Sequence, residues 1–233
     1  MHLSLLPLVR TVVDLVFPPT CLACQKSLQP DERHLCASCW ASIPRASPSL
    51  SLHQETRAKL VASSEVDELV SAFVFEKEGA LQALAHALKY DGFVTIGHRL
   101  GSEVGEEIRA RRIQADLLIP IPLHRARKRE RGFNQAEVIA RGISGVTGIP
   151  LRTDLLKRAR NTRSRTKLTL EERSDNMKDA FFVPASSAPA LKSLRCILVD
   201  DVITTGATIV SAARVLRNAG AQSVAAASAA LAE

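Results

Sequence analysis

The chain has 233 residues, of which 46% are hydrophobic and 24% are charged, and this composition excludes disordered and fibrous proteins. The formal net charge is +7, and residues 124–173 carry the whole excess, with 14 Lys or Arg against 5 Asp or Glu. A contiguous basic stretch concentrates phosphate-bearing ligands, because its electric field attracts anions. The alternative is a solvated face of ion pairs, which is less favoured because the stretch has few acidic partners.

The first residues of the chain are rich in apolar side chains that recur at the spacing of one helix face. These are Leu5, Val9, Val12, Val13 and Val16. Arg10 and Asp14 interrupt the run and no signal-peptide cleavage site follows, so we expect an amphipathic helix that packs on the body of the protein. A membrane-surface role is less favoured, because Asp14 would face anionic lipid. No run of 18 apolar residues occurs, so we expect no membrane span.

Four of the five cysteines form the pattern C-x2-C-x11-C-x2-C, at Cys21, Cys24, Cys36 and Cys39. Two such knuckles can present four thiolates in the tetrahedral arrangement that Zn²⁺ prefers, and a site with four protein ligands is structural. Disulfides and a redox pair are the alternatives. Disulfides belong to oxidising compartments, whereas we expect a cytoplasmic protein with reduced thiols. His34 lies between the knuckles, and we interpret it as a loop residue rather than a ligand.

Residues 44–65 are rich in Pro, Ser and other polar residues, which predicts a linker or an irregular segment. We therefore divide the chain into an N-terminal helix and zinc ribbon at 1–43, this linker, and a main domain at 66–233. The Pro- and Ser-containing stretch 184–189 predicts a surface loop within the main domain.

The main domain alternates the patterns of strands and helices. Apolar runs predict buried strands at 69–76, 116–121, 195–199 and 223–230. Apolar residues at helical spacing predict helices at about 81–88, 96–108, 134–146 and 207–218. This alternation predicts an α/β fold with a parallel sheet, which places ligands at the carboxyl ends of the strands.

The segment 196–208, CILVDDVITTGAT, carries the residues with the clearest chemistry. An apolar strand there ends in two acids, and a short run of small and hydroxylated residues leads into a helix. Free amides at a helix start bind phosphate, and Gly206 lets the backbone approach a ligand closely. The acids, Asp200 and Asp201, can accept hydrogen bonds from ribose hydroxyls or hold a hydrated Mg²⁺. The alternative is an ordinary capped turn, but one cap needs only one such residue.

This segment resembles the thirteen-residue signature with which type I phosphoribosyltransferases bind 5-phosphoribosyl-1-pyrophosphate (PRPP). Further segments resemble one branch of that superfamily, the ComF-type competence proteins. They are the cysteine knuckles, ALKYDG at 87–92, LIPIPLHRARKRERGFNQAE at 118–137 and RNTRSRTKLTLEERSDNMKDAF at 160–181. The resemblance implies that residues 66–233 adopt the type I phosphoribosyltransferase fold, a twisted parallel sheet flanked by helices, preceded by a small zinc ribbon.

The resemblance also implies a role for each matching position. Asp200 and Asp201 would be the catalytic pair that contacts the ribose hydroxyls and Mg²⁺. The 5-phosphate would be bound by Thr204, Thr205, Gly206, Ala207 and Thr208. The pyrophosphate would face the loop after Ile121 that carries Arg129, Arg131, Gly132 and Phe133. A flexible lid would carry Arg160, Arg163, Arg165 and Arg173.

Two departures from the family pattern are visible. The family usually has a glutamine at the position of Arg165, and many members carry further cysteine pairs, which residues 45–65 lack. We therefore expect a single zinc site. For any one of the arginines, nonspecific attraction to nucleic acid is an equally good interpretation.

Three functions remain open from the sequence. The first is transfer of the phosphoribosyl group to an unidentified acceptor, with release of pyrophosphate. The second is a non-catalytic PRPP sensor or single-stranded-DNA-binding protein, to which the resemblance to competence proteins points. Its weakness is the shortage of stacking residues, since the chain has seven Phe, one Trp and one Tyr. The third is a structural zinc protein that recruits a protein partner through its basic stretch.

Overall fold

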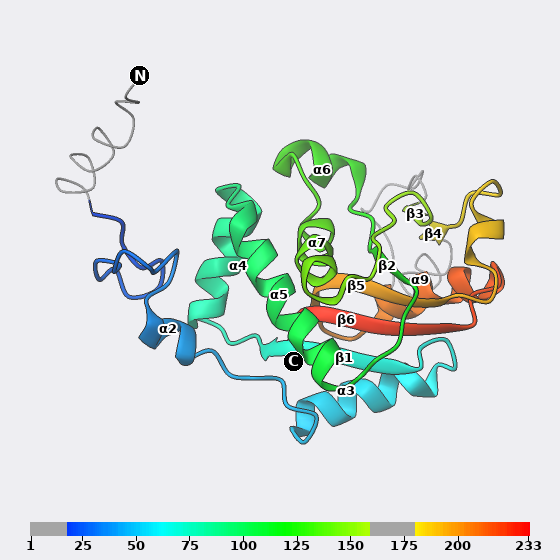
Figure 1. The fold of residues 1–233 in the computed structure, drawn as a ribbon, viewed down its shortest axis with the longest axis horizontal. Helices are drawn as coiled ribbons and strands as arrows, with labels where there is room; N and C mark the ends of the chain where they lie inside the picture. Colours follow the sequence, from blue (N-terminus) through cyan, green and yellow to red (C-terminus); the bar gives the residue numbers. More distant parts are fainter. Residues whose placement is uncertain (1–17, 159–179) are drawn as a thin grey trace, which may run out of the picture.

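The computed structural model describes residues 18–158 and 180–233 (Figure 1). The predicted N-terminal helix and the proposed lid arginines lie outside these residues. The helices are α2 (Ala37–Ala41), α3 (Ser51–Ala62), α4 (Ala80–Tyr90), α5 (Val94–Ala110), α6 (Arg125–Arg131), α7 (Gln135–Thr147), the 3-10 helix η2 (Ala188–Leu191) and α9 (Ala207–Asn218). The strands are β1 (Glu68–Val74), β2 (Leu117–Pro120), β3 (Lys157–Arg158), β4 (Phe181–Phe182), β5 (Arg195–Ile203) and β6 (Ser223–Leu231).

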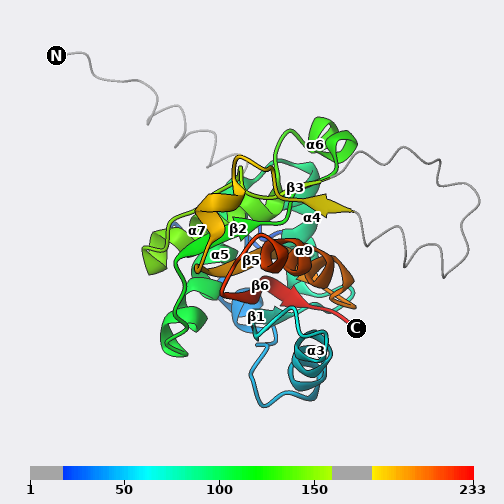
Figure 2. The same cartoon turned by 90° about the vertical axis from the view of Figure 1, so that its right-hand side faces the viewer.

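The core of the molecule is a four-stranded sheet in the order β1-β6-β5-β2, and all of its pairings are parallel. All four residues of β2 are buried, because both faces of the sheet are covered. Residues alternate along β5, so that Ile197 packs with α4, α5 and α7 while Leu198 packs with α9. Figure 2 shows α9 on the opposite side of the sheet from α5 and α7. The predicted α/β fold with a parallel sheet is confirmed.

Helices α5 and α7 lie unusually close together, because glycines face each other where they cross. A Cβ atom on Gly142 would lie 2.2 Å from the backbone oxygen of His98 and 2.9 Å from the Cα of Gly101. Neither position tolerates a side chain without moving a helix backbone. Gly142 therefore serves helix packing.

We expected residues 44–65 to be a linker or an irregular segment, but part of this stretch has regular structure. These residues contain the three-turn helix α3, and the segment before it pairs with the free edge of β1. The amide of Ala46 donates to the carbonyl of Ala72 at 3.0 Å, and the amide of Val74 donates to that of Pro44 at 2.8 Å. This segment is thus built into the main sheet through backbone hydrogen bonds. The domain boundaries that we drew remain a prediction.

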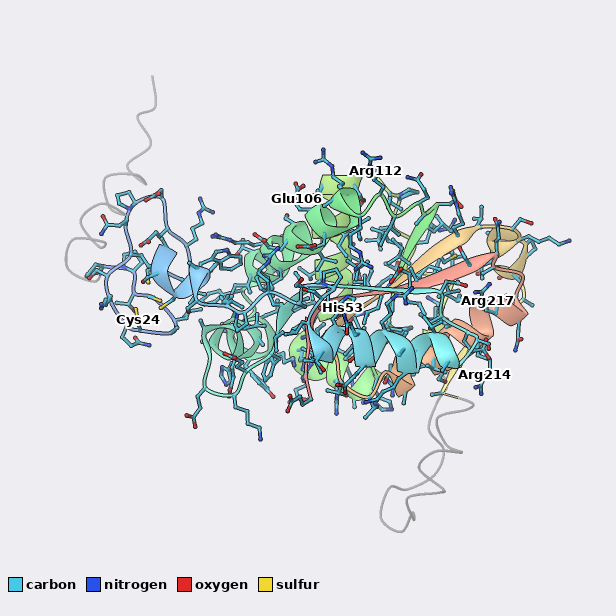
Figure 3. All side chains as sticks on the ribbon, turned by 90° about the horizontal axis from the view of Figure 1, so that it is seen from below. Cys24, His53, Glu106, Arg112, Arg214 and Arg217 are labelled. Atoms are coloured by element: carbon cyan, nitrogen blue, oxygen red, sulfur yellow. The ribbon has the colours of Figure 1, made fainter. Side chains whose placement is uncertain are left out.

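The turn between α3 and β1 is held by ion pairs to α9. Arg214 contacts Glu65 at 3.0 Å, and Arg217 contacts Asp67. Figure 3 shows both arginines on neighbouring turns of the helix that carries them. Both α3 and the start of β1 are therefore attached to the helix that follows the signature segment.

Two further elements differ from the expectations. The basic segment after Ile121, expected as a loop, contains helix α6. Strand β5 extends to Ile203, so the two acids lie inside the strand rather than after it. Within the described residues, every helix falls short of the length and apolarity that crossing a membrane requires.

Candidate functional site

The two acids of the signature segment lie at the carboxyl end of β5, where the sheet narrows. Strand β2 ends at Pro120, which pairs with Val199, so the residues that follow in β5 have no β2 partner. The carboxylates accept backbone hydrogen bonds there instead. The amide of Asp201 donates to Asp200 Oδ1, and the amide of Val202 donates to Asp201 Oδ1, both at 2.9 Å. These bonds hold the carboxyl groups against the strand end.

The electrostatics of this pair are unfavourable without a further cation or donor. Burial raises the pKa of Asp200 to about 8, and the negative charge of Asp201 adds to the rise. A hydrogen bond from the Asp201 amide and the charge of Lys89 act in the opposite direction. A carboxylate whose pKa is raised by burial and by a neighbouring carboxylate is typical of sites that take up a cation or bind hydroxyl donors.

The turn from β5 into α9 is short and leaves the helix start accessible. Three residues separate Ile203 from Ala207, and the last of them, Gly206, has a φ of +75°. As the N-cap residue, Gly206 has no side chain with which to cap the first amides of α9. Thr204 and Thr205 are exposed. The turn therefore combines accessible hydroxyls with the amides and dipole of a helix N-terminus, which favour an anion.

A lysine that the sequence reasoning left without a role completes the acidic end of the site. Lys89, in the last turn of α4, places its Nζ 3.1 Å from Asp201 Oδ2. Lys89 belongs to the ALKYDG segment, which the resemblance to ComF-type proteins singled out. However, this segment lies more than 100 residues before the two acids, and nothing in its sequence indicates that Lys89 contacts them. In Figure 1 the C-terminus of the chain, which follows β6, lies on the side of the sheet nearest α4. Helix α4 therefore borders the carboxyl edge of the sheet.

Helix α6 belongs to the basic segment that we expect to bind pyrophosphate. Its last residue, Arg131, lies close to the end of α4 that carries Lys89. The guanidinium carbon of Arg131 lies 5.8 Å from the centroid of the Tyr90 ring, and its Nη1 donates to Gln135 Oε1 at 3.1 Å. The Nε of Arg131 is buried and has no hydrogen-bond partner among the described residues. Gly132, with a φ of +76°, follows the end of α6, and Arg129 is exposed. The structure thus brings Arg131 to Tyr90, the neighbour of Lys89.

The four cysteines of the N-terminal segment converge as their spacing predicts. The sulfur atoms of Cys21, Cys24, Cys36 and Cys39 all lie within 4.8 Å of one another, and none forms a disulfide. A hydrogen bond with the Ser38 hydroxyl lowers the pKa of Cys36 to about 6, whereas neighbouring cysteines and burial raise that of Cys39 to about 12. Four thiolates this close need a cation to ionise together. The donor set fits structural Zn²⁺.

The zinc-binding segment packs on the main domain through aromatic side chains. Trp40 lies beneath the guanidinium group of Arg99, with 3.8 Å from Cζ to the ring centroid, and meets the Phe73 ring edge-on at 5.8 Å. His34 is not directed at the thiolates. Its Nε2 forms a hydrogen bond with the Thr95 hydroxyl at 2.8 Å. The interpretation of His34 as a residue outside the ligand set agrees with this geometry.

Comparison with known proteins agrees with both parts of the chain. The family model of the phosphoribosyl transferase domain matches residues 128–232, and that of the double zinc ribbon domain matches residues 12–50. The chain is 35% identical to competence protein F of Haemophilus influenzae over 109 residues, 47% of each protein. It is 28% identical to the DNA utilization protein YhgH of Salmonella typhimurium over 209 residues, 88% of this chain and 86% of that one.

A third relative is the competence protein ComFC of Bacillus subtilis, which is 36% identical over 104 residues, 45% of this chain and 39% of that one. The matches to competence protein F and ComFC therefore span less than half of those proteins. The two family models match the two structural parts described above. The chain thus joins a region that matches double zinc ribbon domains to a domain of type I phosphoribosyltransferase fold, and it is similar to the ComF-type competence proteins.

Proposed function

We propose that this protein binds PRPP together with Mg²⁺ at the carboxyl edge of its sheet. The observation that carries the proposal is that two neighbouring acids near the end of β5 are followed, five residues after Asp201, by the N-terminus of α9, whose N-cap residue Gly206 has no side chain. The end of β5 and the turn that follows it therefore offer acceptors for ribose hydroxyls and donors for a phosphate monoester. A ribose 5-phosphate group presents hydroxyls and a phosphate monoester to such a site.

Each part of the ligand has a matching part of the site. Asp200 and Asp201 would hold the ribose hydroxyls and Mg²⁺. The 5-phosphate would lie against the turn from Thr204 to Thr208. Arg129, Arg131 and Gly132 would face the pyrophosphate, for which planar guanidinium groups are well suited. The arginines at 160, 163, 165 and 173 would close over the ligand from the proposed lid.

Catalysis would consist of displacement of pyrophosphate from ribose C1 by a nucleophile of the acceptor. When bound, Mg²⁺ would offset the charge of the leaving pyrophosphate. The acids would fix the ribose ring, and the arginines would stabilise negative charge as the bond to C1 breaks. Among the described residues, no side chain at the site marks the acceptor. We therefore propose phosphoribosyl transfer with the acceptor undefined.

A second candidate function is binding of single-stranded DNA. This function is favoured by the surface around Tyr90. The Tyr90 side chain is 60% exposed, and it lies beside Arg131, the last residue of the basic helix α6. An exposed aromatic ring next to guanidinium groups can stack a base while the arginines neutralise phosphates. The names of the relatives, which refer to competence and DNA utilization, point the same way.

Calorimetric titration of the full chain with PRPP and Mg²⁺ tests the first proposal. The double variant Asp200→Asn, Asp201→Asn should lose PRPP binding while its thermal unfolding remains cooperative. Unchanged affinity in the double variant would remove the proposal. Release of pyrophosphate from PRPP, screened against bases, amines and oligonucleotides, would then separate an enzyme from a sensor.

The DNA candidate has its own test. Binding of a fluorescent single-stranded oligonucleotide should weaken steeply as salt rises, because it depends on phosphate neutralisation. The Asp200→Asn, Asp201→Asn variant should bind the oligonucleotide as the wild type does, whereas Tyr90→Ala should bind it more weakly. A flat salt response would argue against this function.

A further inference from the structure

The ion pair between Lys89 and Asp201 is the feature of the site for which the proposed function has no role. Their side chains are each 27% exposed, and the Nζ to Oδ2 distance is 3.1 Å. Lys89 comes from α4 and Asp201 from β5, so the contact exists only after the chain has folded. An ion pair of this kind is stronger than a fully exposed one, because water screens it less.

The surroundings of the pair are apolar. Both residues line a small cavity of about 20 Å³ whose other walls include Leu81, Leu88, Leu100 and Ile139. A cavity of this size has room for about one water molecule. Among the residues that line the cavity, Lys89 and Asp201 are the two that carry charge, so each is the other's counter-ion there.

The charges of Asp200, Asp201 and Lys89 affect the binding of cations and of anions in opposite ways. Asp200 and Asp201 together carry two negative charges when ionised, and the Lys89 ammonium offsets one of them. A divalent cation would be attracted more strongly if the ammonium were absent. An anionic ligand such as PRPP would be repelled more strongly in that case. The same side chain therefore opposes binding of a cation and assists binding of an anion.

We propose that Lys89 is a positioning residue of this site, acting as an internal counter-ion that holds Asp201 and competes with a divalent cation for it. The proposal rests on the proposed PRPP function only for its anion arm. It assigns to the ALKYDG segment a part in ligand binding, through the carboxylate of Asp201. In the absence of ligand, the Lys89 ammonium offsets part of the repulsion between the two neighbouring carboxylates.

The experiment compares Lys89→Met and Lys89→Arg with the wild type in two separate titrations. In the first, Mn²⁺ alone is added and its binding is followed by the loss of the free Mn²⁺ signal in electron paramagnetic resonance. Lys89→Met should bind Mn²⁺ about fivefold more tightly, and Lys89→Arg, which keeps the charge, should stay close to the wild type. In the second, PRPP with saturating Mg²⁺ should bind about fivefold more weakly to Lys89→Met.

Opposite changes in the two affinities are the signature of a counter-ion, since a merely damaged site would weaken both. The matched control is Lys192→Met, which removes the same charge from an exposed position after η2 and should alter neither titration. Equal Mn²⁺ affinity of Lys89→Met and wild type would overturn the proposal, as would weaker Mn²⁺ binding by Lys89→Met. If Lys89→Met unfolds, Lys89→Gln provides the same test.

Failure of the proposed function is recognised separately. If the wild type does not bind PRPP but Lys89→Met binds Mn²⁺ more tightly, PRPP is the wrong ligand and the counter-ion role stands. If the wild type binds PRPP and Lys89→Met changes neither affinity, the PRPP proposal stands and Lys89 has no such role.

Discussion

Gly206 and Leu60 touch at the start of α9, although one belongs to the signature segment and the other to helix α3, which comes before the main domain in the sequence. A Cβ atom on Gly206 would lie 2.5 Å from Leu60 Cδ2, and Leu60 is only 1% exposed. The backbone at Gly206 also has a φ of +75°, which side chains rarely adopt. Two independent constraints thus hold the proposed phosphate-binding turn in its shape.

Replacing Gly206 by alanine should therefore destabilise the protein and disturb the turn. We expect the free energy of unfolding in urea to fall by about 1–3 kcal/mol, because strain at φ and overpacking against Leu60 add together. Gly148→Ala is the matched control, since Gly148 has a φ of +74° and nothing within 4 Å of its Cβ position. A loss no larger in Gly206→Ala than in Gly148→Ala would show that Leu60 moves aside freely.

The crossing of α5 and α7 gives a second prediction. Gly142→Ala should lower the free energy of unfolding by about 3 kcal/mol, because its Cβ would meet the backbone of His98. Gly145→Ala, in the same helix, has nothing within 4 Å and should gain up to about 1 kcal/mol from its higher helix propensity. Chemical denaturation of the two variants measures both changes. Equal effects would mean that the helices do not approach as closely as described.

Removal of zinc should release the N-terminal segment from the main domain. The chain has one tryptophan, and Trp40 lies between Arg99 and Phe73, so its fluorescence reports on this contact. A strong chelator, or Cys24→Ser, should shift the emission to longer wavelength as Trp40 becomes hydrated. Cys196→Ala, which removes the buried cysteine of β5, should leave zinc content and emission unchanged. Unaltered emission after complete zinc loss would show that docking does not need the metal.

His53 gives the fold a dependence on pH. This residue of α3 is 1% exposed, and neither ring nitrogen has a hydrogen-bond partner among the described residues (Figure 3). Burial lowers its pKa below 6.5, and the charge of Arg111 contributes to the shift, while that of Glu68 opposes it. The unfolded chain then binds a proton that the folded chain does not. Stability is therefore fully present above about pH 6.5 and is lost as the pH falls toward the folded pKa.

The variant His53→Leu should remove this dependence. Between about pH 6.5 and pH 5, the wild type should lose up to about 1.4 kcal/mol of stability per pH unit from this residue, and the variant should not. Urea denaturation at several pH values measures the slopes. His34, whose pKa burial also lowers, contributes in the same range, so the difference between the two proteins isolates His53. Parallel slopes would contradict the assignment.

Local patterns in the chain were sufficient for the parts of the molecule that depend on near neighbours. The buried strands, the helices α4, α5, α7 and α9, and the cysteine knuckles follow from periodicity and spacing within a few residues. The acids, Gly206 and the start of α9 are likewise neighbours in sequence, so their adjacency was predictable. Here the physical determinants act over the length of one turn, one strand or one helix.

Other features depended on contacts between distant segments. Helix α3 was missed because it buries His53 and Thr56 beside Leu60, so its face toward β1 lacks an apolar repeat. Helix α6 was missed because its sequence, RARKRER, has no apolar periodicity. The partnership of Lys89 with Asp201, and that of Leu60 with Gly206, required the packed sheet. Burial and charge pairing are properties of where segments meet, and only the tertiary structure decides which segments do.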